Sequence, residues 1–326
     1  MRARTLGPVV VCGQLLLSRA AFEAPVRIEI SARELSCERA HFLSRTTLEV
    51  RFADVDLEDS EFGQPSIVAG SLSRFKRDDA GDLLDDSELE QLCPRGPTPR
   101  VSSLHRANVE NLAVANADLR QCRFSGAYNL DRLRFGEGVE IDRERRRFRT
   151  RRLTIDEERQ FRDQAKKEPG QANPETLTAD RIARAYRALR KGREDNKNEP
   201  GAADFYYGEM EMRRKAASGF ERLILIMYWL VSGYGLRASR SVAFLLATVL
   251  LFALGFAAFS GFDPDQGYWR SLLFSAESTS GLFRPPRPPS GAELNDEGHI
   301  FQMGLRLLGP LFLGLALLAL RGRVKR

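Results

Sequence analysis

The pattern of hydrophobic and polar positions is most uneven near the C-terminal end of the chain. One stretch, SVAFLLATVLLFALGFAAFSGF, runs from Ser241 to Phe262 without a charged side chain. A helix rises about 1.5 Å per residue, so this stretch is long enough to cross the roughly 30 Å of hydrocarbon in a bilayer. A second apolar stretch, from Ile300 to Leu320, is followed by basic residues at the end of the chain. The two stretches predict a hairpin of transmembrane helices at residues 241–262 and 300–320.

A shorter apolar segment precedes this hairpin. It reads LILIMYWLVSGYGL, and basic residues lie on both sides of it. The segment is short for a span, and its aromatic and basic residues are typical of a helix lying in the membrane interface, at residues 222–236. Six basic residues lie between Arg213 and Arg240, whereas only three lie between the two spans. This bias predicts a two-span protein of the cell membrane with both termini in the cytoplasm. If the segment spanned instead, the C-terminus would lie on the other side.

The segment between the two spans resembles part of an ion channel. The sequence YWRSLLFS followed by AESTSGLF is similar to the pore helix and filter of two-span potassium channels. The resemblance places Glu277, Thr279 and Gly281 in a pore loop. The second filter glycine is missing and the spacing is shorter, so potassium selectivity is not implied. Arg306, two turns into the second span, either reaches outward to the membrane surface or faces the interior of an oligomer.

The N-terminal part of the chain follows a different period. Apolar or small residues recur at every fifth position, and again two positions before each of these. A period of five fits neither a helix nor a flat strand, so we expect a solenoid that turns a corner every five residues. A cleaved signal would also suit the apolar start, but the register continues unbroken out of it. An ordinary β-rich domain is the other alternative. The apolar repeat positions are Cys12, Leu17, Phe22, Ala32, Cys37, Phe42, Phe52, Leu57 and Phe62, then Leu104, Val109, Val114, Leu119 and Phe124.

The units Ala107-Asn-Val109 and Ala117-Asp-Leu119 resemble the pentapeptide-repeat family. The resemblance implies a right-handed, four-sided β-helix, here over residues 1–135. Arg27, Arg45 and Thr47 depart from it at positions that the family keeps small or apolar.

Residues 63–102 interrupt the repeat with glycines, prolines and an acidic run. We interpret them as an inserted loop with a short helix at Ser87 to Leu92. Its carboxylates lack the spacing of a calcium loop and are interpreted as solvated.

Residues 136–220 are predicted to be a charged helical region, with a helical hairpin at 178–217. The arginines between Arg143 and Arg152 suit a helix surface or a strip on anionic lipid better than a nucleic-acid arm, because no aromatic platform accompanies them. In the second helix of the hairpin, three carboxylates lie close to aromatic residues. We interpret them as the exposed side of that helix rather than as a catalytic pair. They are Asp204, Glu209 and Glu211.

The composition narrows the possible functions. The 326 residues include 50 Lys and Arg against 44 Asp and Glu, and the basic surplus lies in the membrane-proximal half, which favours anionic lipid over nucleic acid. Four cysteines and three histidines show no metal, redox or catalytic-triad spacing, so we expect no metal, no cofactor and a reduced compartment. Cys12, Cys37 and Cys122 fall on inward repeat positions and are predicted to be buried.

The predicted fold is mixed, with a pentapeptide β-helix followed by a helical hairpin and a two-helix transmembrane region. The similarity of residues 182–326 to the C-terminal region of actinobacterial membrane-bound pentapeptide-repeat proteins implies no established activity. The leading hypothesis is a non-enzymatic, membrane-anchored scaffold that presents a surface to an unknown cytoplasmic protein. The alternative is a homo-oligomeric, channel-like protein with a degenerate pore loop. An enzyme or a DNA mimic is disfavoured by the lack of a converging catalytic set and by the basic charge.

Overall fold

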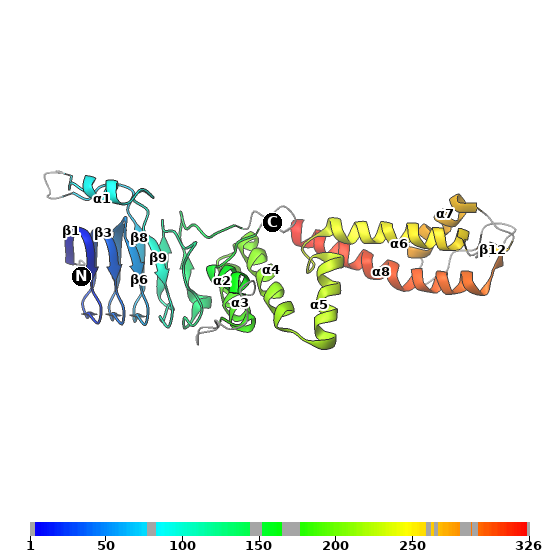
Figure 1. Cartoon of the computed structure of the whole chain (residues 1–326), viewed down its shortest axis with the longest axis horizontal. Helices are drawn as coiled ribbons and strands as arrows, with labels where there is room; N and C mark the ends of the chain where they lie inside the picture. The colour runs from blue at the N-terminus through cyan, green and yellow to red at the C-terminus, as the bar shows by residue number, and fades with distance from the viewer. Residues whose placement is uncertain are drawn as a thin grey trace. The chain divides into compact units, whose positions relative to one another are not determined.

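The computed structural model describes residues 4–76, 83–143, 152–164, 177–258, 262–263, 267–280, 288 and 293–324. The chain divides into two compact units, Met1–Ala216 and Ala217–Arg326. Figure 1 shows strands in the N-terminal part of the chain and helices in the C-terminal part.

The first unit begins with a parallel β-solenoid of about six turns (Figure 1). One sheet has the order β11-β10-β8-β5-β3-β6-β9, with β1 paired to β3, and a second has the order β2-β4-β7. The predicted β-solenoid is therefore confirmed, while the direction in which its coils wind stays a prediction. The strands are β1 (Arg4–Leu16), β2 (Ala21–Phe22), β3 (Val26–Ser36), β4 (His41–Phe42), β5 (Thr46–Arg51), β6 (Asp54–Asp56), β7 (Glu61–Phe62), β8 (Ser66–Gly70), β9 (Arg100–Ser103), β10 (Leu112–Ala115) and β11 (Arg134–Phe135).

The coil length explains the period of five. Phe22, Phe42 and Phe62 occupy equivalent positions on β2, β4 and β7, so one coil takes 20 residues, or four sides of five. Their rings stack with centroids 5.2 and 4.9 Å apart. At the corner before this stack, the N–H of Ala40 donates to the carbonyl of Cys37 over 3.0 Å. Each side of the coil has one central residue that points inward. Because each side is five residues long, apolar residues recur at every fifth position.

The departures from the repeat have a local cause on β3. Val26, Ile28 and Ile30 alternate inward and are each at most 6% exposed, so the inward register shifts by one residue on this side. Arg27 consequently points outward and pairs with Glu29 on the same strand over 3.0 Å and with Glu49 of the neighbouring coil over 2.8 Å. An arginine at a five-residue position therefore does not break the core.

The inserted segment is shorter than the sequence pattern indicates. β8 lies within residues 63–102, yet it pairs with β5 and β10 as a regular part of the sheet. The predicted short helix is present as α1 (Ser87–Leu92). A buried ion pair joins the residue before α1 to the solenoid, because Arg51 Nε lies 2.8 Å from Asp86 Oδ2 and both side chains are at most 5% exposed.

Cys12 contradicts its predicted inward position. It is half-buried and packs with Val10 against a small apolar cluster of Phe52, Leu89 and Cys93, outside the main core. Cys37 and Cys122 are fully buried in the solenoid, as predicted. The inserted segment thus covers part of the outer surface of the solenoid and forms a second, smaller apolar cluster there.

Helices α2, α3 and α4 follow the solenoid in the first unit. α3 (Ala179–Asp195) and α4 (Glu199–Ala216) pack against each other after a short connection, whereas α2 (Asp156–Gln164) precedes them. The 3₁₀ turn η1 (Leu130–Arg132) contacts α3. The apolar residues on the inner faces of α3 and α4 join the solenoid core, and they include Ile182, Ala185, Tyr186, Leu189, Phe205 and Met212. The hairpin therefore closes the C-terminal end of the solenoid.

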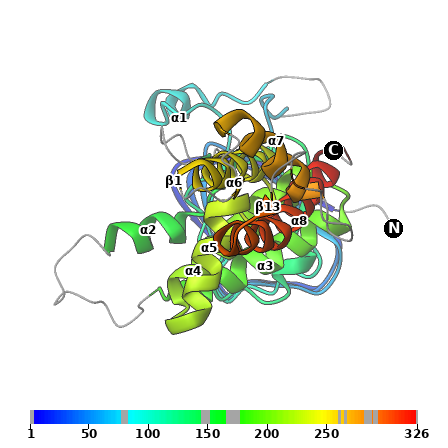
Figure 2. The ribbon, with the colours of Figure 1, turned by 90° about the vertical axis from the view of Figure 1, so that its right-hand side faces the viewer.

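The second unit contains α5 (Gly219–Ser232), α6 (Ala238–Ala258), α7 (Gly267–Ser280) and α8 (Asp296–Val324), with a small antiparallel pair, β12 (Phe262–Asp263) and β13 (Glu293–Leu294). α6 and α8 lie side by side, and Figure 2 shows them nearly along their axes. Residues 238–258 and 296–317 are long and apolar enough to cross a membrane. Together with the solenoid, these two candidate spans confirm the predicted fold class.

An aromatic cluster holds the end of the second unit where α6 finishes and α8 begins. Phe256 of α6 and Phe274 of α7 meet edge to face, with ring centroids 5.5 Å apart. Phe262 of β12 and Leu305 of α8 complete the buried part of the cluster. α7 is thereby packed against both candidate spans.

Candidate functional site

The residues expected in a pore loop lie on α7 and α8. Glu277 is exposed on α7, and Thr279 is half-buried near the end of the same helix. Gly281 lies outside the described residues. Arg306 is half-buried on α8, three residues before Gly309. A Cβ atom on Gly309 would lie 2.7 Å from the Cα atom of Thr279, so the structure brings Thr279 directly against the backbone of α8.

The face of α7 that packs inward carries three serines beside Phe274. Ser271, Ser275 and Ser278 are fully buried. The hydroxyls of Ser275 and Ser278 have no hydrogen-bond partner among the residues that the structure describes, and a buried unpaired hydroxyl costs free energy. The filter-like Thr279 is helical, and its hydroxyl donates to the carbonyl of Ala276 over 2.7 Å. This geometry differs from the extended, carbonyl-lined filter of a potassium channel.

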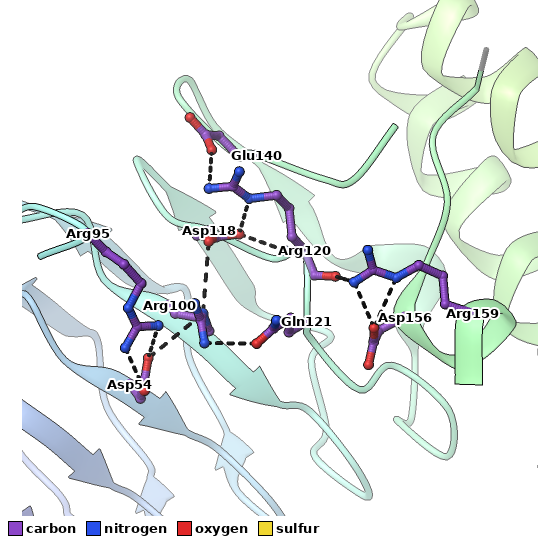
Figure 3. Close-up of polar contacts among 9 residues, drawn as sticks. All are labelled: Asp54, Arg95, Arg100, Asp118, Arg120, Gln121, Glu140, Asp156 and Arg159. Atoms are coloured by element: carbon purple, nitrogen blue, oxygen red, sulfur yellow. Dashed lines mark hydrogen bonds and ion pairs between the residues drawn. The ribbon is translucent and has the colours of Figure 1, made fainter. Parts of the chain in front are cut away.

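A column of charged residues on the solenoid was not expected from the sequence. Asp54 pairs in register with Arg100 of the next coil, Arg100 with Asp118, and Asp118 with Glu140. Parallel strands lie roughly 4.8 Å apart, so in-register residues of successive coils stack on one face. Two further arginines, Arg95 and Arg120, pair with this column. We call Asp54, Arg95, Arg100, Asp118, Arg120 and Glu140 the charged ladder (Figure 3).

Arginines offset the like charges of the ladder. Arg95 binds Asp54 through both terminal nitrogens, at 3.2 Å each. Arg120 bridges the last two coils, with 3.0 Å to Asp118 and 2.9 Å to Glu140. Arg100 lies between the two ends and donates to Gln121 over 2.8 Å. Figure 3 shows these side chains pointing toward one another across the coils.

Two hollows adjoin along the ladder. One, of about 550 Å³, contains Asp54, Arg95 and Arg100 in its lining. The other, of about 840 Å³, lies between the last coil and the connection from α3 to α4. Both are lined by Arg120, Glu140 and Asp142, so they share a rim. Their volumes fall within the range of small-molecule sites.

A buried ion pair lies beneath this end of the solenoid. Arg152 binds both carboxylate oxygens of Glu158, at 2.6 and 2.7 Å, and neither side chain is more than 1% exposed. The hydroxyl of Tyr186 donates to Glu158 over 2.5 Å. A Cβ atom on Gly208 of α4 would lie 2.6 Å from the Tyr186 ring, so only glycine allows this approach. Arg152 thus has a structural role, which corrects its predicted place on a basic surface, while residues 144–151 lie outside the described part.

The neighbouring Glu157 contacts the solenoid backbone. Its Oε1 atom accepts the N–H groups of Phe124 and Ser125, at 2.5 and 2.7 Å. Burial raises the pKa of Glu157 to about 7, although these hydrogen bonds favour the charged form. Two adjacent glutamates of α2 therefore anchor this helix, one to a coil and one to the Arg152 side chain.

The carboxylates of α4 differ from their predicted exposure. Glu209 is 2% exposed and pairs with Arg190 over 2.8 Å. Asp204 accepts the backbone N–H of Leu153 over 3.2 Å. The expectation that Asp204, Glu209 and Glu211 form the exposed side of the helix is wrong, because the first two connect α4 to its neighbours and the Glu211 side chain is only 12% exposed. Asp204 and Glu209 hold the hairpin in place.

Acidic side chains, histidines and cysteines are the groups that could hold a metal ion or supply a reactive thiol in the described ranges. No cluster of three or more His, Cys, Asp or Glu side chains there is placed to hold a metal ion. Burial raises the pKa of Cys37 to about 12 and that of Cys122 well above its ordinary value. These two thiols stay protonated at neutral pH and behave as small apolar groups.

Comparisons with protein-family models, with curated proteins and with solved structures find no match to this chain. The β-solenoid of about six turns is consistent with a pentapeptide-repeat fold.

The sequence does contain a signal for the ladder. Arg100 and Arg120 lie 20 residues apart, one coil length, and Asp118 lies two residues before Arg120. A search for charged residues at the coil period rather than at the five-residue period would have found this pair. The members before the insertion, such as Asp54, could be aligned only after the length of the insertion was known.

Proposed function

We propose that this protein is a membrane-anchored scaffold whose solenoid presents the charged ladder to a cytoplasmic protein. The observation that carries the proposal is the in-register column from Asp54 to Glu140, which displays paired charges on successive coils. Candidate spans α6 and α8 hold the chain at the membrane. The excess of basic residues before the first span supports cytoplasmic termini.

The ladder has properties that suit protein recognition. Asp54 and Arg100 lie on strands β6 and β9, and Asp118 and Glu140 lie at isolated bridges, so the backbone of the column is already ordered, which lowers the ordering cost of binding. Arg120 is 51% and Glu140 59% exposed, so their pair is weak in water and can exchange for pairs with a partner. Complementary charges fix the register of a partner and speed its association more than they add affinity.

Site-specific crosslinking in cells tests this proposal. A photoreactive residue at exposed Gln121, beside the ladder, should give one discrete adduct, and the same residue at exposed Glu23 should not. Reversing Arg95 and Arg120 to glutamate should abolish the adduct. Reversing Arg33, an exposed arginine of β3 outside the ladder, should leave it. Equal adducts at Gln121 and Glu23, or none at Gln121, would contradict the scaffold.

A specific observation favours a second candidate, an oligomeric channel-like protein. α7 has 14 residues, about 21 Å of helix, which is too short to span a bilayer. Its last turn lies against Gly309, roughly 20 Å along α8 from Asp296. A half-length helix with a buried serine face, placed between two candidate spans, has the form of a re-entrant helix beside a polar pathway.

Conductance of the purified full chain in planar bilayers tests this second candidate. Ion currents that fall when Glu277 or Arg306 is changed to glutamine, but not when the exposed Glu297 is changed, support a pathway near α7. Absence of current under both polarities would rule out the channel-like candidate and would leave the scaffold unaffected.

A further inference from the structure

The carboxylates that line the larger hollow of the first unit do not pair with all of its arginines. The hollow is lined by three arginines and three carboxylates, with apolar walls from Val139, Ile141, Leu153 and Pro200. The carboxylates all have protein partners. Glu140 pairs with Arg120, Asp142 with Arg159, and Asp204 accepts the Leu153 N–H. The other two arginines of the hollow, Arg193 and Arg143, have no carboxylate partner among the described residues.

Arg193 of α3 is the first of these. Its guanidinium lies 4.2 Å from the centre of the Phe135 ring, and its Nε atom is buried without a hydrogen-bond acceptor. Among the described residues no carboxylate lies within ion-pair distance of it. Burial lowers the pKa of Arg193, and no neighbouring negative charge opposes this effect. A partly buried cation without a counter-ion is costly, so an external anion would stabilise it.

Arg143 is the second. It lies on the last described turn of the coil, bridges to Leu153 through the backbone, and is exposed at the mouth of the same hollow. No ion pair links it to a carboxylate in the described part of the chain. The N-terminus of α4, which also borders the hollow, adds little to this site because Asn198 already accepts the N–H of Gly201 over 3.0 Å.

We propose that this hollow is a binding site for an organic phosphate monoester. Two arginines without carboxylate partners match the charge of about −2 that a phosphate monoester carries near neutral pH. Guanidinium groups bind phosphate oxygens through paired hydrogen bonds. The apolar walls at Val139, Leu153 and Pro200 fit the carbon part of such a ligand. The hollow of about 840 Å³ holds a molecule of that size.

Calorimetric titration of the full chain in phosphatidylcholine nanodiscs tests the site. Phenyl phosphate should bind more tightly than inorganic phosphate, since its ring covers the apolar walls. Arg193→Gln should weaken binding of phenyl phosphate by about tenfold or more, the loss expected for charged hydrogen bonds. The matched control, Arg187→Gln, changes an exposed arginine of the same helix and should bind as the wild type does.

Arg143→Gln gives an independent test, because Arg143 is exposed and its replacement should not disturb folding. It should also weaken phenyl phosphate binding. Wild-type affinity in both Arg193→Gln and Arg143→Gln would overturn the site, as would the absence of heat with either phosphate compound.

The source of the phosphate is resolved by repeating the titration in nanodiscs containing phosphatidic acid. Weaker apparent binding of phenyl phosphate there identifies a lipid headgroup as the competing ligand. Unchanged binding identifies a soluble phosphate ester, and either result supports the phosphate site. The hollow shares Arg120 and Glu140 with the charged ladder, but the phosphate site depends on Arg143 and Arg193, which are not part of the ladder, so crosslinking at Gln121 can fail while the titration succeeds.

Discussion

Arg152 and Glu158 are among the most deeply buried charges in the first unit. Glu158 also accepts the Tyr186 hydroxyl and pairs with Arg162, but Arg152 is its fully buried bidentate partner, so removal of Arg152 would leave the Glu158 charge poorly compensated in the core. Arg152→Met should therefore lower the free energy of unfolding by about 3–5 kcal/mol. Thermal unfolding of the full chain measures this. Arg95→Ala, which breaks an exposed pair, should cost no more than about 1 kcal/mol, and an equal loss in both variants would contradict the buried role.

Glu157 should make stability depend on pH. Its pKa rises from 4.5 in the unfolded chain to about 7 in the folded protein, so the folded state favours the protonated form. The contribution of protonated Glu157 to the free energy of unfolding is fully present below pH 4.5. It is lost as the pH rises toward 7, and the total loss is roughly 3 kcal/mol. Glu157→Gln should remove this slope. The measurement is the unfolding midpoint of the wild type and of Glu157→Gln from pH 5 to 8. If the two midpoints changed in parallel with pH, Glu157 would not be the source of the pH dependence.

The stacked phenylalanines show how a single position stabilises the solenoid element. Phe42 is fully buried between the rings of Phe22 and Phe62, whereas Phe22 lies at the end of the stack and is half-buried. Phe42→Ala should cost about 3–5 kcal/mol because it leaves a cavity between two coils. Phe22→Ala should cost clearly less. Equal unfolding midpoints for Phe42→Ala and Phe22→Ala would show that burial within the phenylalanine stack does not determine the loss of stability.

α5 presents an apolar face that its own unit does not cover. Phe220, Leu223, Ile224 and Met227 are each at least 50% exposed and recur at helical spacing. Such a face suits the interfacial position predicted for residues 222–236. With Trp269 replaced by phenylalanine, brominated lipids should quench the emission of Trp229. Replacing Leu223, Ile224 and Met227 with serine should reduce this quenching. Unchanged quenching would contradict a helix bound through that face.

At the scale of the whole molecule, the predicted topology has both termini in the cytoplasm. A reporter fused after Arg326 and one fused before the solenoid should both score as cytoplasmic. An external signal from the C-terminal fusion alone would mean that residues 222–236 cross the membrane. In that case the interfacial assignment of α5 would be wrong, whereas the solenoid and its ladder would be unaffected.

The solenoid could be predicted because each coil reuses one spacing, and the corner bond between Ala40 and Cys37 shows the cause. The inward register could not be followed through Arg27, since β3 alternates with a period of two at that point. Cys12 was misplaced for a related reason. Its side chain packs against α1, a segment 75 residues later, and five-residue counting cannot detect such a contact.

Length and hydropathy alone identify two helices able to cross a membrane, because a bilayer selects for total apolar length and not for particular contacts. The coil period can likewise be predicted from the spacing of nearby residues, since every side of the coil buries one residue. The charged ladder, the Arg152 pair and the phosphate pocket depend instead on which coils become neighbours. An insertion of unknown length separates Asp54 from Arg100, so only the folded chain shows that these charges lie side by side.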